Sequence, residues 1–178
     1  MRIVAGKHRG LSLNAFEAEN IRPTTDRVRE NIFNKIQFGI AGSKVLDLFC
    51  GTGAVSLEFL SRGAGSVLSV DNNAKSIKLI RQNFEKAHEK PNLITSDFKS
   101  VLSKLSGEKF DYIFLDPPFD TDYGEIAIKM IDENNLIDDG IIIYEHLADK
   151  KFNLPNTLKV VDEKKYGTIM VSFIEKEI

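Results

Sequence analysis

Short apolar runs alternate with amphipathic stretches from Ser43 onward, and this alternation restricts the chain to a few folds. The predicted strands cover residues 45–49, 66–71, 93–97, 110–116 and 140–145. The predicted helices cover residues 54–62, 74–88 and 123–134, and a short helix follows residue 97. This order predicts an α/β protein with a mostly parallel sheet and helices on both faces. Two adjacent runs, 157–164 and 168–175, predict an antiparallel pair at the end.

The first 42 residues read as an extension that is too short to hold a core of its own. Residues 3–13 alternate around Gly6 and Gly10, which predicts a short hairpin, and residues 14–23 are polar and predict a loop. Thr24 and Thr25 can cap the helix that follows. The apolar face of that helix contains Val28, Ile32, Phe33 and Ile36, and Gly39 and Gly42 end it. We therefore expect a single domain, residues 1–178, in which the extension 1–42 packs on a core of residues 43–178.

Composition and charge limit the class of protein and the cellular location that we expect. The chain is 42% hydrophobic and 28% charged, which is typical of a globular protein. No apolar stretch approaches the roughly 20 residues of a membrane span, and no signal peptide is recognisable. Cys50 is the only cysteine, so a reducing cytoplasm is expected. The net charge is −2, yet residues 1–37 carry seven Lys/Arg against four Asp/Glu. This basic arm is compatible with phosphate contacts and equally with ordinary surface variation.

Ligands of such sheets bind beyond the carboxyl ends of the strands. The residues expected at those ends are Asp47, Gly51, Gly53, Asp71, Asp97 and Asp116. The run Gly51-Thr52-Gly53 predicts a sharp turn that lets a ligand approach the backbone, but Ser56 stands where a dinucleotide fingerprint has its third glycine.

The acids suggest which cofactor this turn binds. Asp47, in the turn region, can hold a cationic amino group, and Asp71, 20 residues after Gly51, can accept hydrogen bonds from ribose hydroxyls. Asp97 can bind an adenine amino group, with Phe98 against the ring. A ligand with an ammonium and a sulfonium but no phosphate suits this set, so S-adenosylmethionine is predicted. Any one of these acids alone would read equally as a turn residue or a helix cap.

The run Asp116-Pro117-Pro118-Phe119 follows the fourth predicted strand and is the candidate catalytic motif. The prolines fix the backbone and remove two donors. Asp116 and the Pro117 carbonyl can accept the two N–H groups of an exocyclic base amine, and Phe119 can stack on the flipped base. Alone, the motif could be a rigid turn.

The remaining residues with reactive side chains give weaker indications of catalysis or metal binding. Cys50 lies within the predicted cofactor turn and reads as a small packing residue. His8, His88 and His146 lack metal-ligand spacing, so surface or cap roles are expected for them, and no metal is predicted.

Three segments carry a resemblance to a known family. They are Arg22-Pro23-Thr24-Thr25-Asp26-Arg27-Val28-Arg29-Glu30, Leu60-Ser61-Arg62-Gly63-Ala64 and Arg2-Ile3-Val4-Ala5-Gly6. With the two site motifs they resemble the RsmD family, bacterial 16S ribosomal RNA guanine-N2 methyltransferases, from residue 2 to about residue 173. The family often has Trp at the position of His8 and Ala at that of Cys50.

The resemblance implies a Rossmann-like class I methyltransferase fold, with a seven-stranded sheet and an N-terminal hairpin and helix. It implies methylation of one guanine in 16S RNA on an assembled small subunit, by a cytoplasmic protein that we expect to be a monomer. The expected cofactor-binding residues are Thr25, Arg27, Asp47, Phe49, Gly51, Thr52, Gly53, Asp71, Asn72, Asp97 and Phe98. The expected RNA-binding residues are Arg2, Lys7, His8, Arg9 and Arg22.

Alternatives remain at this point. A DNA adenine or protein glutamine methyltransferase more often carries Asn at the position of Asp116 and Tyr at that of Phe119, and the chain has no spare residues for a DNA-recognition module. A small-molecule methyltransferase fits the basic arm and the Asp116 motif less well. A non-catalytic RNA-binding or assembly factor has no physical need for an intact set of site residues. The prediction of guanine, and not adenine, as the substrate base depends on the resemblance alone.

Overall fold

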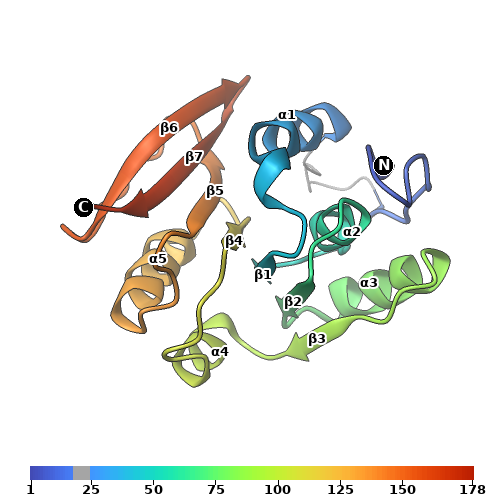
Figure 1. The fold of residues 1–178 in the computed structure, drawn as a ribbon, viewed down its shortest axis with the longest axis horizontal. Helices are drawn as coiled ribbons and strands as arrows, with labels where there is room; N and C mark the ends of the chain where they lie inside the picture. Colours follow the sequence, from blue (N-terminus) through green and yellow to red (C-terminus); the bar gives the residue numbers. More distant parts are fainter. Residues whose placement is uncertain (18–24) are drawn as a thin grey trace.

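The structure is a computed structural model that describes residues 1–17 and 25–178. Within these residues seven strands form one sheet in the order β3-β2-β1-β4-β5-β7-β6. Their bounds are β1 Lys44–Leu48, β2 Ser66–Asp71, β3 Asn92–Thr95, β4 Tyr112–Leu115, β5 Ile141–Leu147, β6 Leu158–Tyr166 and β7 Ile169–Lys176. Strands β1 to β5 run parallel, and β7 is antiparallel to both β5 and β6. The predicted parallel sheet with its C-terminal antiparallel pair is confirmed (Figure 1).

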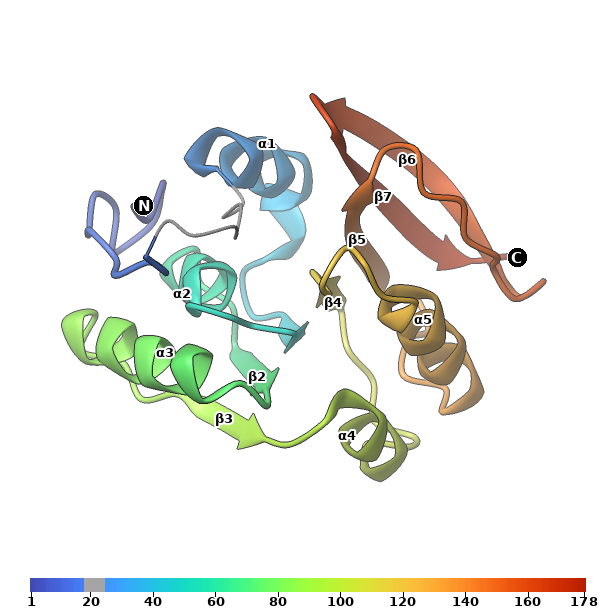
Figure 2. The same cartoon turned by 180° about the vertical axis from the view of Figure 1, so that it is seen from behind.

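Helices cover both faces of this sheet (Figures 1 and 2). Their bounds are α1 Asp26–Ile36, α2 Ala54–Ser61, α3 Ala74–Lys86, α4 Phe98–Lys104 and α5 Tyr123–Glu133, with a 3₁₀ turn η1 at Gln37–Gly39. Successive side chains of a strand point to opposite faces. In β4, Tyr112 and Phe114 therefore pack with α1 and α2, whereas Ile113 and Leu115 pack with α4 and α5. No helix in the described ranges is both long enough and apolar enough to span a membrane.

The N-terminal segment follows the predicted hairpin path without forming strands. Its two limbs join through one bridge, Arg2 to Ser12, and through hydrogen bonds such as that from the Ile3 nitrogen to the Leu11 oxygen at 3.0 Å. Ile3 and Leu13 are buried against α2 and α3. The segment therefore packs on α2 and α3 through buried side chains.

Helix α1 begins at the predicted position. The Oγ1 atom of Thr25 accepts a hydrogen bond from the Val28 nitrogen at 3.3 Å, which is the predicted cap. The predicted inner face is confirmed for Ile32, Phe33 and Ile36, which are buried, while Val28 is half-buried. The predicted cap Thr24 and most of the loop 14–23 lie outside the described residues.

Candidate active site at the carboxyl edge of the sheet

The turn after β1 has an unusual backbone. Phe49, Gly51 and Gly53 have φ values of 67°, 53° and 80°, so three of five residues are left-handed. A Cβ on Gly53 would lie 2.5 Å from the Ile80 side chain, so this position accepts only glycine. Phe49 has no such freedom, and a non-glycine residue in this region is strained. The strain lies where the sequence predicts a bound ligand.

Asp71 holds this turn in place from the end of β2. Its Oδ2 accepts a hydrogen bond from the Gly51 nitrogen at 2.9 Å, and its Oδ1 accepts one from the Asn73 nitrogen at 2.9 Å. Each carboxylate oxygen can accept a second hydrogen bond, and the side chain is half-buried. Asp71 is therefore a fixed acceptor at the carboxyl edge, as its predicted role requires.

Asp47 lies deeper than the sequence predicts. It is inside β1 and only 1% exposed, beneath the turn and not within it. Its Oδ2 accepts a hydrogen bond from Ser56 Oγ at 2.6 Å, and Ser56 Oγ lies 2.7 Å from Ser69 Oγ. The pKa of Asp47 is raised to about 7, chiefly by burial; the Ser56 hydrogen bond opposes the rise and the nearby charge of Asp71 adds to it. The serine at the third glycine position thus supplies a partner for a buried carboxyl group.

Asp97 and Phe98 begin α4 at the same edge. The Asp97 carboxylate accepts hydrogen bonds from the Ser100 hydroxyl at 2.7 Å and the Ser100 nitrogen at 3.0 Å, and these bonds lower its pKa. Asp97 is thus a helix cap, which is the alternative interpretation of this residue from the sequence. Its side chain is also exposed. The Phe98 ring lies 5.0 Å from that of Phe49 and 5.2 Å from that of Tyr123. Tyr123, which no sequence motif marks, completes this aromatic cluster.

The candidate catalytic motif lies beside the turn. Leu115 at the end of β4 pairs with Leu48 at the end of β1, so Asp116 and Phe49 leave the sheet side by side. Asp116 and Phe119 are half-buried. The loop is held by its own hydrogen bonds, since the Pro118 oxygen accepts from Thr121 Oγ1 at 2.7 Å. The sequence-predicted motif and the sequence-predicted turn thus meet at one edge.

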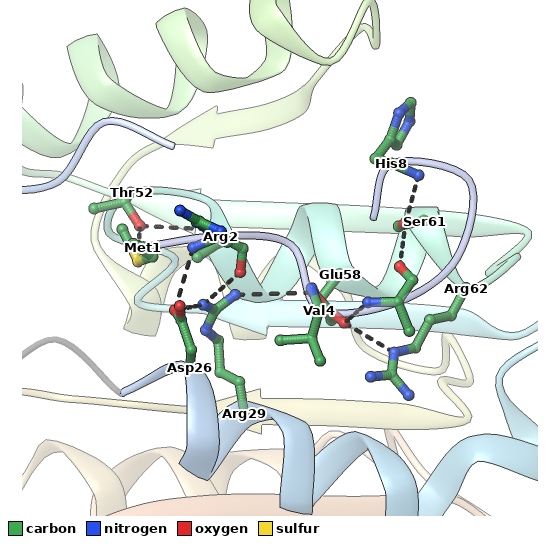
Figure 3. A network of polar contacts seen from close by, with 12 residues as sticks. Met1, Arg2, Val4, His8, Asp26, Arg29, Thr52, Glu58, Ser61 and Arg62 are labelled. Atoms are coloured by element: carbon green, nitrogen blue, oxygen red, sulfur yellow. Dashed lines mark hydrogen bonds and ion pairs between the residues drawn. The ribbon is translucent and has the colours of Figure 1, made fainter. Parts of the chain in front are cut away.

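A buried polar network attaches the N-terminal segment to this site (Figure 3). Glu58 of α2 is fully buried, and its carboxylate accepts hydrogen bonds from the Val4 nitrogen at 2.9 Å and the Ala5 nitrogen at 3.1 Å. Arg62 Nε donates to Glu58 at 2.9 Å, and Arg29 Nη1 lies 3.8 Å from it. Only one weak signal in the sequence marks Glu58, which is a single acid inside the apolar helix 54–61.

The same network fixes the start of α1. Arg29 is 1% exposed and donates both to the Arg2 oxygen at 2.7 Å and to Asp26. Asp26 also accepts a hydrogen bond from the Arg2 nitrogen at 3.2 Å, and Met1 Sδ lies 4.0 Å from Thr52 Oγ1 (Figure 3). These contacts therefore hold the first turn of α1 close to the glycine turn. Thr25, the predicted cofactor-binding residue that caps α1, is held there with it.

Asn72 is exposed and follows Asp71 at the same edge. The other predicted residues that the structure describes lie outside this cluster. Arg27 is exposed, and its positive charge acts on Tyr166 at the end of β6, where it opposes the rise in the pKa of Tyr166 that burial causes. Arg2 and Arg9 are exposed, and Arg22 lies outside the described residues. Lys7 Nζ and His8 Nε2 contact Glu89 at 2.5 and 2.8 Å.

Two other predictions can be checked. The prediction of a surface or cap role is wrong for His146, which is buried with its Nε2 atom 2.7 Å from Ser172 Oγ; burial lowers its pKa. Residues 141–147 form a strand that is buried on both faces, so alternation does not mark His146. Cys50 is buried as predicted, and burial raises the pKa of its thiol.

Comparison with known proteins identifies the fold and the family. The family model described as "Conserved hypothetical protein 95" matches residues 1–175. "Ribosomal RNA small subunit methyltransferase D" of Escherichia coli strain K12 is 35% identical over 180 residues, covering 99% of this chain and 90% of that protein. The protein of the same name from Haemophilus influenzae is 35% identical over 174 residues, covering 95% and 90%. The solved structure of "Putative methyltransferase yhhF from Escherichia coli" has a TM-score of 0.88 and 26% identity, with 100% and 98% of the chains covered.

The fold and these relatives define the class as a class I, S-adenosylmethionine-dependent methyltransferase. Within that class the chain belongs to the RsmD family, the family of the conserved hypothetical protein 95 model, which confirms the resemblance.

Proposed function

We propose that this methyltransferase modifies the exocyclic N2 amine of one guanine in the 16S RNA of the small ribosomal subunit, on assembled particles in the cytoplasm, as a monomer. The observation that supports this most directly is the meeting of Asp116-Pro117-Pro118-Phe119 with the Gly51-Thr52-Gly53 turn at one sheet edge. The names of the relatives support an RNA substrate in the small subunit.

The donors and acceptors at the edge fit S-adenosylmethionine, which supplies an electrophilic methyl group when bound. Asp71 can accept hydrogen bonds from ribose hydroxyls while it holds the Gly51 nitrogen. Asp47 lies beneath the turn, and the ionised form of its carboxyl group attracts the ammonium group. Phe49, Thr52 and Gly53 shape the turn.

The rest of the cofactor site comes from neighbouring elements. Asn72, Asp97 and Phe98 lie along the same edge and can contact the ribose and adenine, and Thr25 can close the site from the start of α1. Arg27, whose charge acts on Tyr166 in this structure, would have to turn toward the site to join it.

Asp116 and the Pro117 carbonyl orient the amino nitrogen of the substrate by accepting its two N–H groups, while Phe119 stacks on the base. Catalysis is then mostly positioning. The nitrogen gains a methyl group and becomes acidic, so it loses one proton, which Asp116 can accept or pass to water. Pro118, whose carbonyl is bonded to Thr121, keeps the loop rigid.

The N-terminal extension, residues 1–42, is the proposed RNA contact, through Arg2, Lys7, His8, Arg9 and Arg22. The exposed side chains of Arg2 and Arg9 support this role. Lys7 and His8 share Glu89, so RNA phosphate has to compete with that carboxylate.

Transfer of radiolabelled methyl groups to unmodified small subunits tests the proposal, with naked 16S RNA and duplex DNA alongside. We expect label in the subunits alone, its loss in Asp116→Ala, and its retention in Asp120→Ala, an exposed acid of the same loop. Equal labelling by Asp116→Ala, or labelling of DNA in place of RNA, would refute the assignment.

A further inference from the structure

The positive charge of the protein is concentrated in two short segments. Residues 1–14 contain three Lys/Arg and no acid, and residues 74–90 contain five Lys/Arg and two Glu. Together these segments carry +6, so the rest of the chain carries −8, because the net charge of the whole is −2. Such an asymmetry creates a directional field that favours a polyanion on one side.

The two segments lie side by side. The Asn14 nitrogen donates to Asn83 Oδ1 at 2.7 Å, and Lys86 Nζ donates to Asn14 Oδ1 at 2.6 Å. Lys7 and His8 reach Glu89 just beyond α3. Both ribbon views place the N-terminal segment beside α3 (Figures 1 and 2). The segments therefore form one continuous surface.

Three cations on α3 are available to a partner. Lys75 and Arg81 are exposed, as is Lys78 between them, and no acid within residues 1–17 and 25–178 forms an ion pair with any of the three. Glu85 is the only acid of α3 itself. The helix starts three residues after Asp71, so this row of cations begins at the rim of the candidate cofactor site.

The opposite side of the molecule repels a polyanion. Residues 120–139, which follow the candidate catalytic motif and include α5, contain seven acids and one lysine. Helices α3 and α5 lie at opposite ends of both ribbon views (Figures 1 and 2). An RNA partner is thus drawn to the α3 side.

We propose that Lys75, Lys78 and Arg81 of α3, together with Arg9 of the N-terminal segment, bind the phosphodiester backbone of the substrate RNA at a distance from the reacting guanine. This inference rests on the proposed RNA substrate and extends the contact surface beyond the N-terminal extension. Phosphate contacts of this kind position an RNA without reading its sequence.

A charge-removing triple variant, Lys75→Gln/Lys78→Gln/Arg81→Gln, tests the proposal. Binding to unmodified 16S RNA transcript is measured over a series of KCl concentrations. Each lost phosphate contact lowers the salt slope by about 0.7–0.9, so the slope is expected to fall by about 2 and the affinity by about tenfold. In methylation assays KM for unmodified small subunits is expected to rise with kcat unchanged, since the variant leaves the Asp116 edge intact.

Two matched triples complete the test. Lys104→Gln/Lys129→Gln/Lys165→Gln removes the same charge from exposed positions on α4, α5 and β6 and should bind like the wild type. Lys75→Arg/Lys78→Arg/Arg81→Lys keeps the charge and should also bind like the wild type. An unchanged slope in the first variant, or equal losses in all three, would overturn the proposal. Failure of the wild type to methylate any RNA would instead refute the proposed function, while the binding slopes would still decide the role of α3.

Discussion

Asp47→Asn should stabilise the protein in a manner that depends on pH. Because burial raises the pKa of Asp47 from 3.8 to about 7, the folded protein binds this proton more tightly than the unfolded chain does. The stability contributed by the neutral form is complete below about pH 4 and is lost as pH rises to about 7. At 1.36 kcal/mol per pKa unit, ionising the folded carboxyl costs about 4 kcal/mol.

Asparagine avoids this cost, because it cannot ionise and its carbonyl can still accept the Ser56 hydrogen bond. The advantage of the variant in unfolding free energy should therefore grow by about 3 kcal/mol between pH 5 and pH 8. Urea denaturation of the cofactor-free protein at both pH values measures it. Asp139→Asn, at an exposed position, should show a difference from the wild type that stays within about 0.5 kcal/mol at both pH values. A difference for Asp47→Asn that does not change with pH would refute the reasoning.

Three further substitutions test the site. Glu58→Ala removes the acceptor at the centre of the N-terminal network and should lower the free energy of unfolding, measured by urea denaturation, by about 3–5 kcal/mol. The control Glu108→Ala removes an exposed member of an ion pair and should cost less than about 1 kcal/mol. A loss below about 1 kcal/mol for Glu58→Ala would contradict the proposed role of the network. Gly53→Ala should cost about 3 kcal/mol, because its Cβ meets an isoleucine side chain at 2.5 Å, whereas Gly107→Ala, with nothing within 4 Å, should cost about 1; equal losses would show that the contact relaxes freely. Asp116→Ala should lower kcat at least about 100-fold while calorimetry finds cofactor affinity within about twofold of the wild type, and a parallel loss of affinity would reassign Asp116 to cofactor binding.

The fold was predictable because its signals are local. Alternating apolar runs and amphipathic helices marked every strand and helix of the core to within a few residues, and paired glycines marked the turn at Gly51 and Gly53. Successive parallel strands end at one edge, so Asp71, Asp97 and Asp116 were predictable as neighbours.

The buried polar residues were not predictable from the sequence. Their hydrogen-bond partners are distant in the sequence, or are backbone groups that no residue type reveals. Glu58 binds the backbone nitrogens of Val4 and Ala5, which any residues would supply. Asp47 stands between two leucines in a strand that is buried on both faces, where alternation does not separate the strand from the turn. His146 sits in a similar strand. In each case tertiary packing decided burial.

Nucleoside analysis of the methylated RNA tests the central claim most directly. Small subunits that lack the modification are incubated with the protein and S-adenosylmethionine, and the digested RNA is examined by mass spectrometry together with the position of the modified nucleotide. The account predicts N2-methylguanosine at a single position of 16S RNA. N6-methyladenosine, or methyl groups on ribosomal protein only, would contradict it.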